Sequence, residues 1–185
     1  NGQIGNGQIS PVNTACGQAG HKCKDVPTLT RVKGANGYDA AGLAFGDRHA
    51  CALLDDGAVV CWGRNNAGQL GTSGGDKDTP QSINLGAGRT ATSIHAGGNY
   101  NCAILDDDSV KCWGQNDEGQ LGRGFTSSSE NTPATINSLG SGRTAVALAT
   151  AFSTVCALLD DGSVKCWGDD SDGQLGNGGS DTDIS

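Results

Sequence analysis

A string of thirteen residues that occurs three times constrains the fold of this chain more than any other feature. It reads CALLDDGAVVCWG at 51–63, CAILDDDSVKCWG at 102–114 and CALLDDGSVKCWG at 156–168. A Gly-Gln-Leu-Gly word follows each copy, at steps of 51 and then 54 residues, and begins at Gly68, Gly119 and Gly173. A period of about 50 residues with several short strands per unit is typical of a propeller blade or a β-solenoid.

The repeat divides the whole chain into units. A related word, GQIGNG, opens the chain at Gly2, so the first unit is 1–71 and carries about fifteen extra residues around Cys16 and Cys23. The later units are 72–122 and 123–176, and 177–185 starts a further one. In the middle copy we expect four strands, near 81–85, 91–95, 101–105 and 109–113. The predicted fold is therefore all-β, an array of four-stranded antiparallel blades with about three full blades plus terminal half-blades.

The centre of each string predicts a tight β-hairpin. Cys156 and Cys166 are symmetric about Asp161, which leaves Asp160-Asp161-Gly162 as a three-residue loop. Asp, Asp and Gly suit a type I turn followed by a residue with positive φ. Glycine adopts positive φ without strain, and Asp108, at the same place in the middle copy, is among the few other residues that tolerate it.

The hairpin register predicts disulfides. It pairs Leu158 with Val164 and places the two cysteines of each string opposite one another. Opposed residues in antiparallel strands have Cα atoms about 4.5–5.5 Å apart, within reach of a disulfide. We expect Cys51–Cys61, Cys102–Cys112 and Cys156–Cys166, with Cys16 and Cys23 left to form a fourth. We expect the three tryptophans that follow the second cysteines to fill the core between blades: Trp62, Trp113 and Trp167.

Composition excludes several classes of function. The eight cysteines are an even number, which suits disulfides in a secreted, extracellular protein, and no Cys-x-x-Cys spacing supports zinc. The net charge of −8 argues against nucleic acid as a partner. No window reaches the 18 or more apolar residues of a membrane span. The chain begins at Asn1 without Met or a signal peptide, so we take it as a processed chain or an excerpt of a longer one.

The repeated words together resemble the RCC1-like repeat, the blade unit of the regulator-of-chromosome-condensation propellers. The resemblance rests on Cys-Ala-Leu-Leu, then Cys-Trp-Gly, then Gly-Gln-Leu-Gly, with a preceding Ala96-Gly97, and covers nearly the whole chain outside 10–25. It implies a propeller of four-stranded blades, usually seven. Members act as exchange factors for small GTPases, chromatin binders or secreted protein binders such as β-lactamase inhibitors. The paired cysteines are similar to those of extracellular microbial and algal members.

Three full units are too few to close a propeller, which needs about four blades. Three arrangements stay open: the chain belongs to a longer propeller, two copies close one ring, or the ends pair from copy to copy and build a filament.

A search for chemistry predicts no catalytic residue and no metal site. The histidines, His21, His49 and His95, stand at different places in their units, and no nucleophile–base pair accompanies them. We therefore expect no enzyme and no cofactor. Acidic loops such as 169–173 offer carboxylates to calcium, but their spacing does not match a known calcium loop.

Loops that differ between units are the best candidates for binding, because recognition requires differences. These are the 45–50 and 97–101 loops and the 10–25 insertion, and the candidate residues are Arg48, His49, Asn99 and Tyr100. We interpret His49 as a surface or blade-top residue.

The leading hypothesis is a non-enzymatic extracellular scaffold that assembles with itself or binds another protein. A lectin-like or inhibitor-type propeller is the alternative, and an exchange factor for small GTPases is the least favoured.

Overall fold

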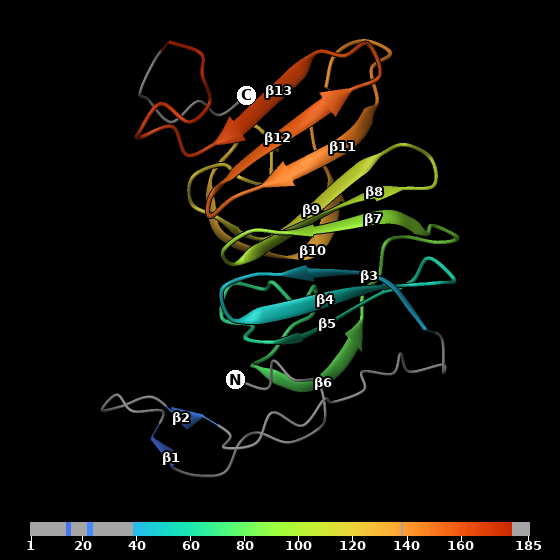
Figure 1. Cartoon of the computed structure of the whole chain (residues 1–185), viewed down its shortest axis with the longest axis vertical. Coiled ribbons are helices and arrows are strands. Elements are labelled where there is room, and N and C mark those ends of the chain that lie inside the picture. The colour runs from blue at the N-terminus through green and yellow to red at the C-terminus, as the bar shows by residue number, and fades with distance from the viewer. Residues whose placement is uncertain (1–13, 16–21, 24–38, 138, 179–185) are drawn as a thin grey trace.

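In the computed structural model of this chain, the described residues are 14–15, 22–23, 39–137 and 139–178, and within them every regular element is a β-strand. β1 (Thr14–Ala15) and β2 (Lys22–Cys23) pair as a short antiparallel hairpin. The remaining strands form three antiparallel sheets, which lie one above another in Figure 1. The all-β blade array predicted from the repeat is confirmed.

Within each sheet, strands that are consecutive in the chain are neighbours. The first sheet contains β3 (Ala40–Phe45), β4 (His49–Leu54), β5 (Val59–Gly63) and β6 (Lys77–Ser82). The second contains β7 (Ala91–Ala96), β8 (Tyr100–Leu105), β9 (Val110–Asn116) and β10 (Ser127–Thr135). The third contains β11 (Ala145–Thr150), β12 (Thr154–Leu159) and β13 (Val164–Gly168). We call these sheets blades 1, 2 and 3.

The structure groups the strands differently from the prediction in one respect. The strand expected near 81–85 was assigned to the same unit as the strands that follow it. The structure has this strand earlier, at Lys77–Ser82 (β6), and β6 pairs with β5 and completes blade 1. The physical reason is that the Gly-Gln-Leu-Gly loop after β5 reverses the chain, so that the next strand, β6, pairs antiparallel with β5 at the edge of the same sheet. Blade 1 therefore runs from β3 to β6 and blade 2 from β7 to β10, whereas the described part of blade 3 contains β11, β12 and β13.

The hairpins have the predicted register and turn. Cys51 pairs with Cys61, Cys102 with Cys112 and Cys156 with Cys166. The third loop residue has positive φ in every copy: 79° at Gly57, 63° at Asp108 and 83° at Gly162. The second aspartate of each loop accepts a hydrogen bond from the amide two residues on, so these carboxylates stabilise the turns.

Three disulfides join the opposed cysteines across β4–β5, β8–β9 and β12–β13, with Cα–Cα distances of 4.1, 4.1 and 4.0 Å. The first two lie completely buried between blades, whereas Cys156 and Cys166 of blade 3 are half-buried. The fourth expected disulfide involves Cys16, which lies outside the described residues.

The core of the array lies between blades rather than within a blade. One cluster joins Cys51, Leu53 and Val59 of blade 1 to Ile94 and Trp113 of blade 2. A second joins Cys102, Ile104 and Val110 of blade 2 to Leu148 and Trp167 of blade 3. Blades 1 and 2 thus each bury their hairpin under the next blade, and the chain stabilises itself by stacking.

The disulfides of blades 2 and 3 give a matched test of this arrangement. Cys102–Cys112 and Cys156–Cys166 both span 10 residues, so the chain-entropy effect on the unfolded state is the same, about 2–3 kcal/mol. Only the first is fully buried, and its removal also leaves a cavity between blades. We expect C102A/C112A to lower the free energy of unfolding by about 1–2 kcal/mol more than C156A/C166A. Urea unfolding followed by circular dichroism measures both, and equal losses would contradict an inter-blade core.

Candidate functional site

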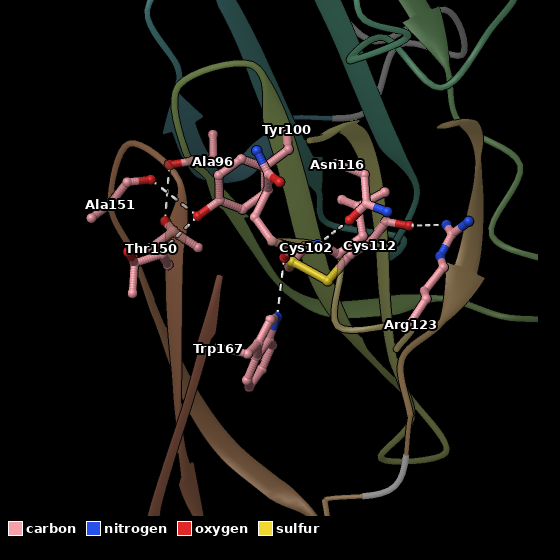
Figure 2. Close-up of a disulfide and its surroundings, with 12 residues drawn as sticks. Ala96, Tyr100, Cys102, Cys112, Asn116, Arg123, Thr150, Ala151 and Trp167 are labelled. Atoms are coloured by element: carbon pink, nitrogen blue, oxygen red, sulfur yellow. Dashed lines mark hydrogen bonds between the residues drawn. A yellow bond between two sulfur atoms is a disulfide. The ribbon is translucent and has the colours of Figure 1, made fainter. Parts of the chain in front are cut away.

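The tryptophan of one blade binds the Gly-Gln-Leu-Gly loop of the blade before it. Trp113 Nε1 donates to the backbone oxygen of Gln69 at 3.1 Å, and Trp167 Nε1 donates to that of Gln120 at 3.0 Å. Figure 2 shows Trp167 beside the Cys102–Cys112 disulfide of the preceding blade. Trp62 is 2% exposed and belongs to a cluster on the other face of blade 1.

A buried Asn or Asp, three residues after each tryptophan, shapes this loop. Oδ1 accepts a hydrogen bond from the leucine amide of the loop: Asn65 from Leu70, Asn116 from Leu121 and Asp170 from Leu175, at 2.8–3.0 Å. The asparagine amides also donate to following carbonyls, as Asn65 does to Thr72 and Gly74. Asp170 has no amide to donate, and among the described residues its Oδ2 is buried without a hydrogen-bond partner. The sequence analysis missed this position, although its recurrence three residues after each tryptophan is visible in the sequence.

A row of backbone hydrogen bonds ties together the loops at one end of the blades. Asp47 N donates to Gly98 O in the next blade, and Gly98 N donates to Phe152 O in the blade after, each at 3.0 Å. These residues stand at the same position in the β3–β4, β7–β8 and β11–β12 loops, which lie along one side of the stack in Figure 1. We call this side the loop end. Its backbone is fixed while its side chains differ from blade to blade.

Two of the residues predicted for binding are buried. His49 is 0% exposed, and its Nε2 donates to Asn101 Oδ1 of the next blade at 2.9 Å. Tyr100 is also 0% exposed, with its hydroxyl 3.0 Å from Ala151 O and 2.8 Å from Thr154 O (Figure 2). The surface position expected for His49 is therefore wrong: both side chains are long enough to reach the adjacent blade, where they satisfy polar groups.

The other two candidates differ in their exposure. Asn99 is half-buried between its own Gln115 and Gln69 of blade 1, to which it is hydrogen bonded. Arg48 is exposed. Sequence reasoning missed two exposed phenylalanines at the same end of the blades, Phe45 at 67% and Phe152 at 65%. The fold places Arg48, Phe45 and Phe152 in solvent on the loop end.

Burial shifts the pKa values of His49 and Tyr100. Desolvation lowers the pKa of His49, although the Asn101 hydrogen bond and the charge of Asp47 oppose the shift. Because Nε2 donates to Asn101, Nδ1 is the unprotonated nitrogen, and it is buried without a hydrogen-bond partner among the described residues. Desolvation raises the pKa of the Tyr100 hydroxyl. Neither residue is placed as a general base or acid, since both face protein groups.

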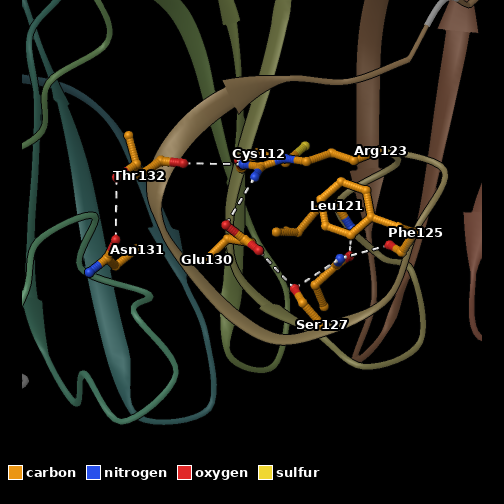
Figure 3. A network of polar contacts seen from close by, with 9 residues as sticks. Cys112, Leu121, Arg123, Phe125, Ser127, Glu130, Asn131 and Thr132 are labelled. Carbon is orange, nitrogen blue, oxygen red and sulfur yellow. Dashed lines mark hydrogen bonds and ion pairs between the residues drawn. The ribbon is translucent and has the colours of Figure 1, made fainter.

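A buried arginine fixes the edge strand of blade 2. The side chain of Arg123 is 10% exposed, and its NH2 donates to Cys112 O at 2.6 Å and to Thr132 O at 3.1 Å. NH1 lies 3.5 Å from a Glu130 carboxylate oxygen that completes the network in Figure 3. Burial lowers the pKa of Arg123. The network connects β10 to β9, so we interpret it as structural.

The acidic hairpin loops lie at the opposite end of the blades. Hydrogen bonds from Ser109 and Ser163 lower the pKa values of Asp107 and Asp161. Arg89 and Arg143 form ion pairs with the same loops at 2.9–3.4 Å. Within the described residues, no three His, Cys, Asp or Glu side chains converge in a way that suits a metal ion. Nor does the described part of the chain contain a helix long and apolar enough to cross a membrane.

Comparison with known proteins agrees with this geometry. Two models of the regulator of chromosome condensation (RCC1) repeat match the chain, one at 41–69, 91–120 and 146–174 and the other at 56–104 and 107–157. The chain belongs to the RCC1 repeat family.

Matches to relatives of known sequence include most of this chain but only a small part of each relative. It is 31% identical to the human E3 ubiquitin-protein ligase HERC2 over 90% of its own length but only 4% of that protein. It is 35% identical to the Arabidopsis thaliana ultraviolet-B receptor UVR8 over 74% of its length and 31% of the receptor.

Solved structures give the same proportions. Prp20p from Saccharomyces cerevisiae superposes with a TM-score of 0.64 at 26% identity, over 74% of this chain and 34% of that one. Human WBSCR16 superposes with a TM-score of 0.70 at 20% identity, over 81% of this chain and 39% of that one, which supports the fold alone. The chain therefore spans about a third of these structures.

The buried histidine predicts a pH dependence of stability. Its folded pKa lies below that of the unfolded chain, so the unfolded state binds more protons in acid. The full stability is present above the unfolded pKa of about 6.5 and is lost as the pH falls below it. We expect the urea midpoint to drop between about pH 7 and pH 5. H49Q should remove most of this drop.

His95 is the matched control, because burial also lowers its pKa but its side chain is only half-buried. H95Q should remove the smaller part of the pH dependence. A drop that is unchanged in H49Q would show that other groups cause it.

Proposed function

We propose that this chain is a non-enzymatic, extracellular scaffold that binds another protein through its loop end. The observation that carries the proposal is the row of backbone hydrogen bonds from Asp47 through Gly98 to Phe152. It holds three loops in fixed positions while it leaves Arg48, Phe45 and Phe152 exposed. A rigid surface that presents aromatic and arginine side chains suits protein recognition, because little conformational entropy is lost on binding.

Relatives support protein binding as the general role of this fold. Prp20p is described with its binding properties to Gsp1p and histones, and a second structure shows yeast RCC1 (Prp20) bound by Kap60, at 26% identity to this chain. Because the chain covers so little of its ligase relatives, we do not extend their activity to it. We propose no cofactor.

The disulfides support the extracellular part of the proposal. All three described blades carry the same bond at the same place, and two of these bonds are integral to the inter-blade core. Disulfides of this kind persist in oxidising compartments. A compartment that kept the cysteines reduced would deprive a thin, glycine-rich core of a large part of its stability.

The alternative roles have less support. Aromatic side chains that also carry a hydrogen-bonding group, which suit sugar sites, are buried here: the described tryptophans and Tyr100 lie in the core, and the exposed aromatic residues of the loop end are phenylalanines. A filament made by head-to-tail stacking would need blade 1 to offer its tryptophan to the next copy. Trp62 is only 2% exposed, so we favour the binding of a different protein over self-assembly.

The state of the thiols tests the compartment. The native protein, purified from cells under conditions that trap free thiols, should show no labelling of the six described half-cystines. Mass spectrometry of the alkylated peptides measures this. Quantitative labelling of the native protein would remove the support for an extracellular role.

The binding surface is tested by capture with variants. The biotinylated full chain is incubated with proteins of its own culture medium, and bound proteins are quantified by mass spectrometry. We expect R48E/F152D to lose at least tenfold of the specifically captured partner, about 1.4 kcal/mol, because charged or aromatic anchors dominate such interfaces.

The control variant D56N/D161N changes two exposed charges at the opposite end of the blades and should leave capture unchanged. Equal loss in both variants would place the binding surface elsewhere.

A further inference from the structure

The charge of the loop end changes sign along the stack of blades. Each blade contributes two segments, the loop after its first strand and the four residues after its Trp-Gly pair. These segments are 46–48 and 64–67 in blade 1, 97–99 and 115–118 in blade 2, and 151–153 and 169–172 in blade 3. Their net charge is +1 in blade 1 (two arginines and one aspartate), −2 in blade 2 (one aspartate and one glutamate) and −3 in blade 3 (three aspartates).

A recurring backbone hydrogen bond holds the two segments of each blade side by side. Arg64 N donates to Arg48 O at 2.8 Å in blade 1, and Gln115 N donates to Asn99 O at 3.0 Å in blade 2. In blade 2 the side chains meet as well, because Asn99 Nδ2 donates to Gln115 Oε1 at 3.0 Å. The two positions are therefore neighbours on the loop end, and in blade 1 both are arginines.

These two arginines differ from the other described arginines in their partners. Arg89, Arg123 and Arg143 each form an ion pair with a carboxylate of their own blade. Within the described residues, neither Arg48, which is exposed, nor Arg64, which is half-buried, forms an ion pair. Like charges on neighbouring residues repel each other, and a carboxylate that binds both guanidinium groups relieves this repulsion.

The carboxylates of blades 2 and 3 stand beside the equivalent positions. Asp117 is exposed and accepts a hydrogen bond from Gln115 Nε2 at 2.8 Å. Asp169 occupies the place of Arg64, since its amide donates to Ser153 O at 3.0 Å. A polyanion laid across the arginines would meet these carboxylates and be repelled. The negative charge of a partner must therefore be confined to blade 1.

We propose that the protein bound at the loop end presents carboxylates to Arg48 and Arg64, and lysine or arginine side chains to the carboxylates of blades 2 and 3. This inference rests on the proposed function, because it names the chemistry of the partner of that same surface. A guanidinium group binds a carboxylate through two parallel hydrogen bonds, which suits the paired arginines. The opposite charge over the other blades then sets the direction in which the partner lies along the stack.

Two synthetic peptides test the charge pattern. One contains three glutamates, a flexible Gly-Ser linker and three lysines, and in the other the glutamates are replaced by glutamines. Fluorescence anisotropy measures their dissociation constants with the full chain at about 20 mM ionic strength, where exposed charges are weakly screened. We expect the glutamates to tighten binding about threefold, although the chain has a net charge of −8.

R48Q/R64Q should reverse the sign of this effect. Without the arginines, the glutamates meet only carboxylates and should weaken binding. The matched control is R89Q/R143Q, which removes the same charge from the opposite end of the blades. It should leave the tightening by glutamate unchanged, and circular dichroism verifies that both variants are folded.

Three results would overturn the proposal. The first is that the lysine-bearing peptides do not bind the unchanged chain, and the second is that the glutamates weaken their binding. The third is an effect of the glutamates that changes equally in R48Q/R64Q and R89Q/R143Q, which would show that only net charge matters. None of these results bears on whether the loop end binds a protein. If R48E/F152D still loses the captured partner, the proposed function stands and only the charge pattern of the partner is refuted.

Discussion

The bond from an indole N–H to the backbone oxygen of a glutamine in the preceding blade determines how the rest of this structure is arranged. It is made twice, at 3.1 and 3.0 Å, and each time it connects two sheets that share no β-ladder. A four-stranded sheet of short strands cannot bury its own faces, so stability comes from stacking against a neighbour. The indole supplies apolar area for that stacking, and its hydrogen bond sets the relative position of the two sheets.

Several repeated residues are explained by this one contact. The glycines at 71 and 122 leave space for the indole, and the Asn or Asp after each tryptophan fixes the loop that receives the next one. The disulfide beside the indole holds the hairpin that forms the floor of the interface. At the loop end, by contrast, the backbone hydrogen bonds recur from blade to blade but the side chains differ. His49 and Tyr100 stand at the same position, and each forms a hydrogen bond to the next blade: His49 to the side chain of Asn101, and Tyr100 to the backbone oxygen of Thr154. Side-chain variation is therefore greatest where the backbone is already held.

The parts of this fold that depend on local spacing could be predicted from the sequence. Cysteines symmetric about Asp-Asp-Gly fix a hairpin register, and hence the disulfides, without knowledge of the tertiary structure. The pairing of β6 with β5 could not be read in this way, because a strand between two repeats can join either sheet and only the direction of the Gly-Gln-Leu-Gly loop decides. The burial of His49 was also not predictable, since its partner Asn101 is 52 residues away in the chain. The exposure of Phe45 and Phe152 was not predictable either, because an aromatic residue in a strand or short loop is expected in the core unless the tertiary structure is known.

Blade 3 shows that the repeated sequence forms the hairpin and loop of a blade even where no described blade covers them. Its hairpin, disulfide and Gly-Gln-Leu-Gly loop have the geometry of their buried counterparts, although Leu158, Val164 and Gln174 are in contact with solvent. The corresponding side chains of blades 1 and 2 are covered by the next blade, and their burial releases water from apolar surface, which stabilises the stack. A repeat that carries both the glycine-lined loop and the tryptophan therefore determines how each blade packs on the one before it.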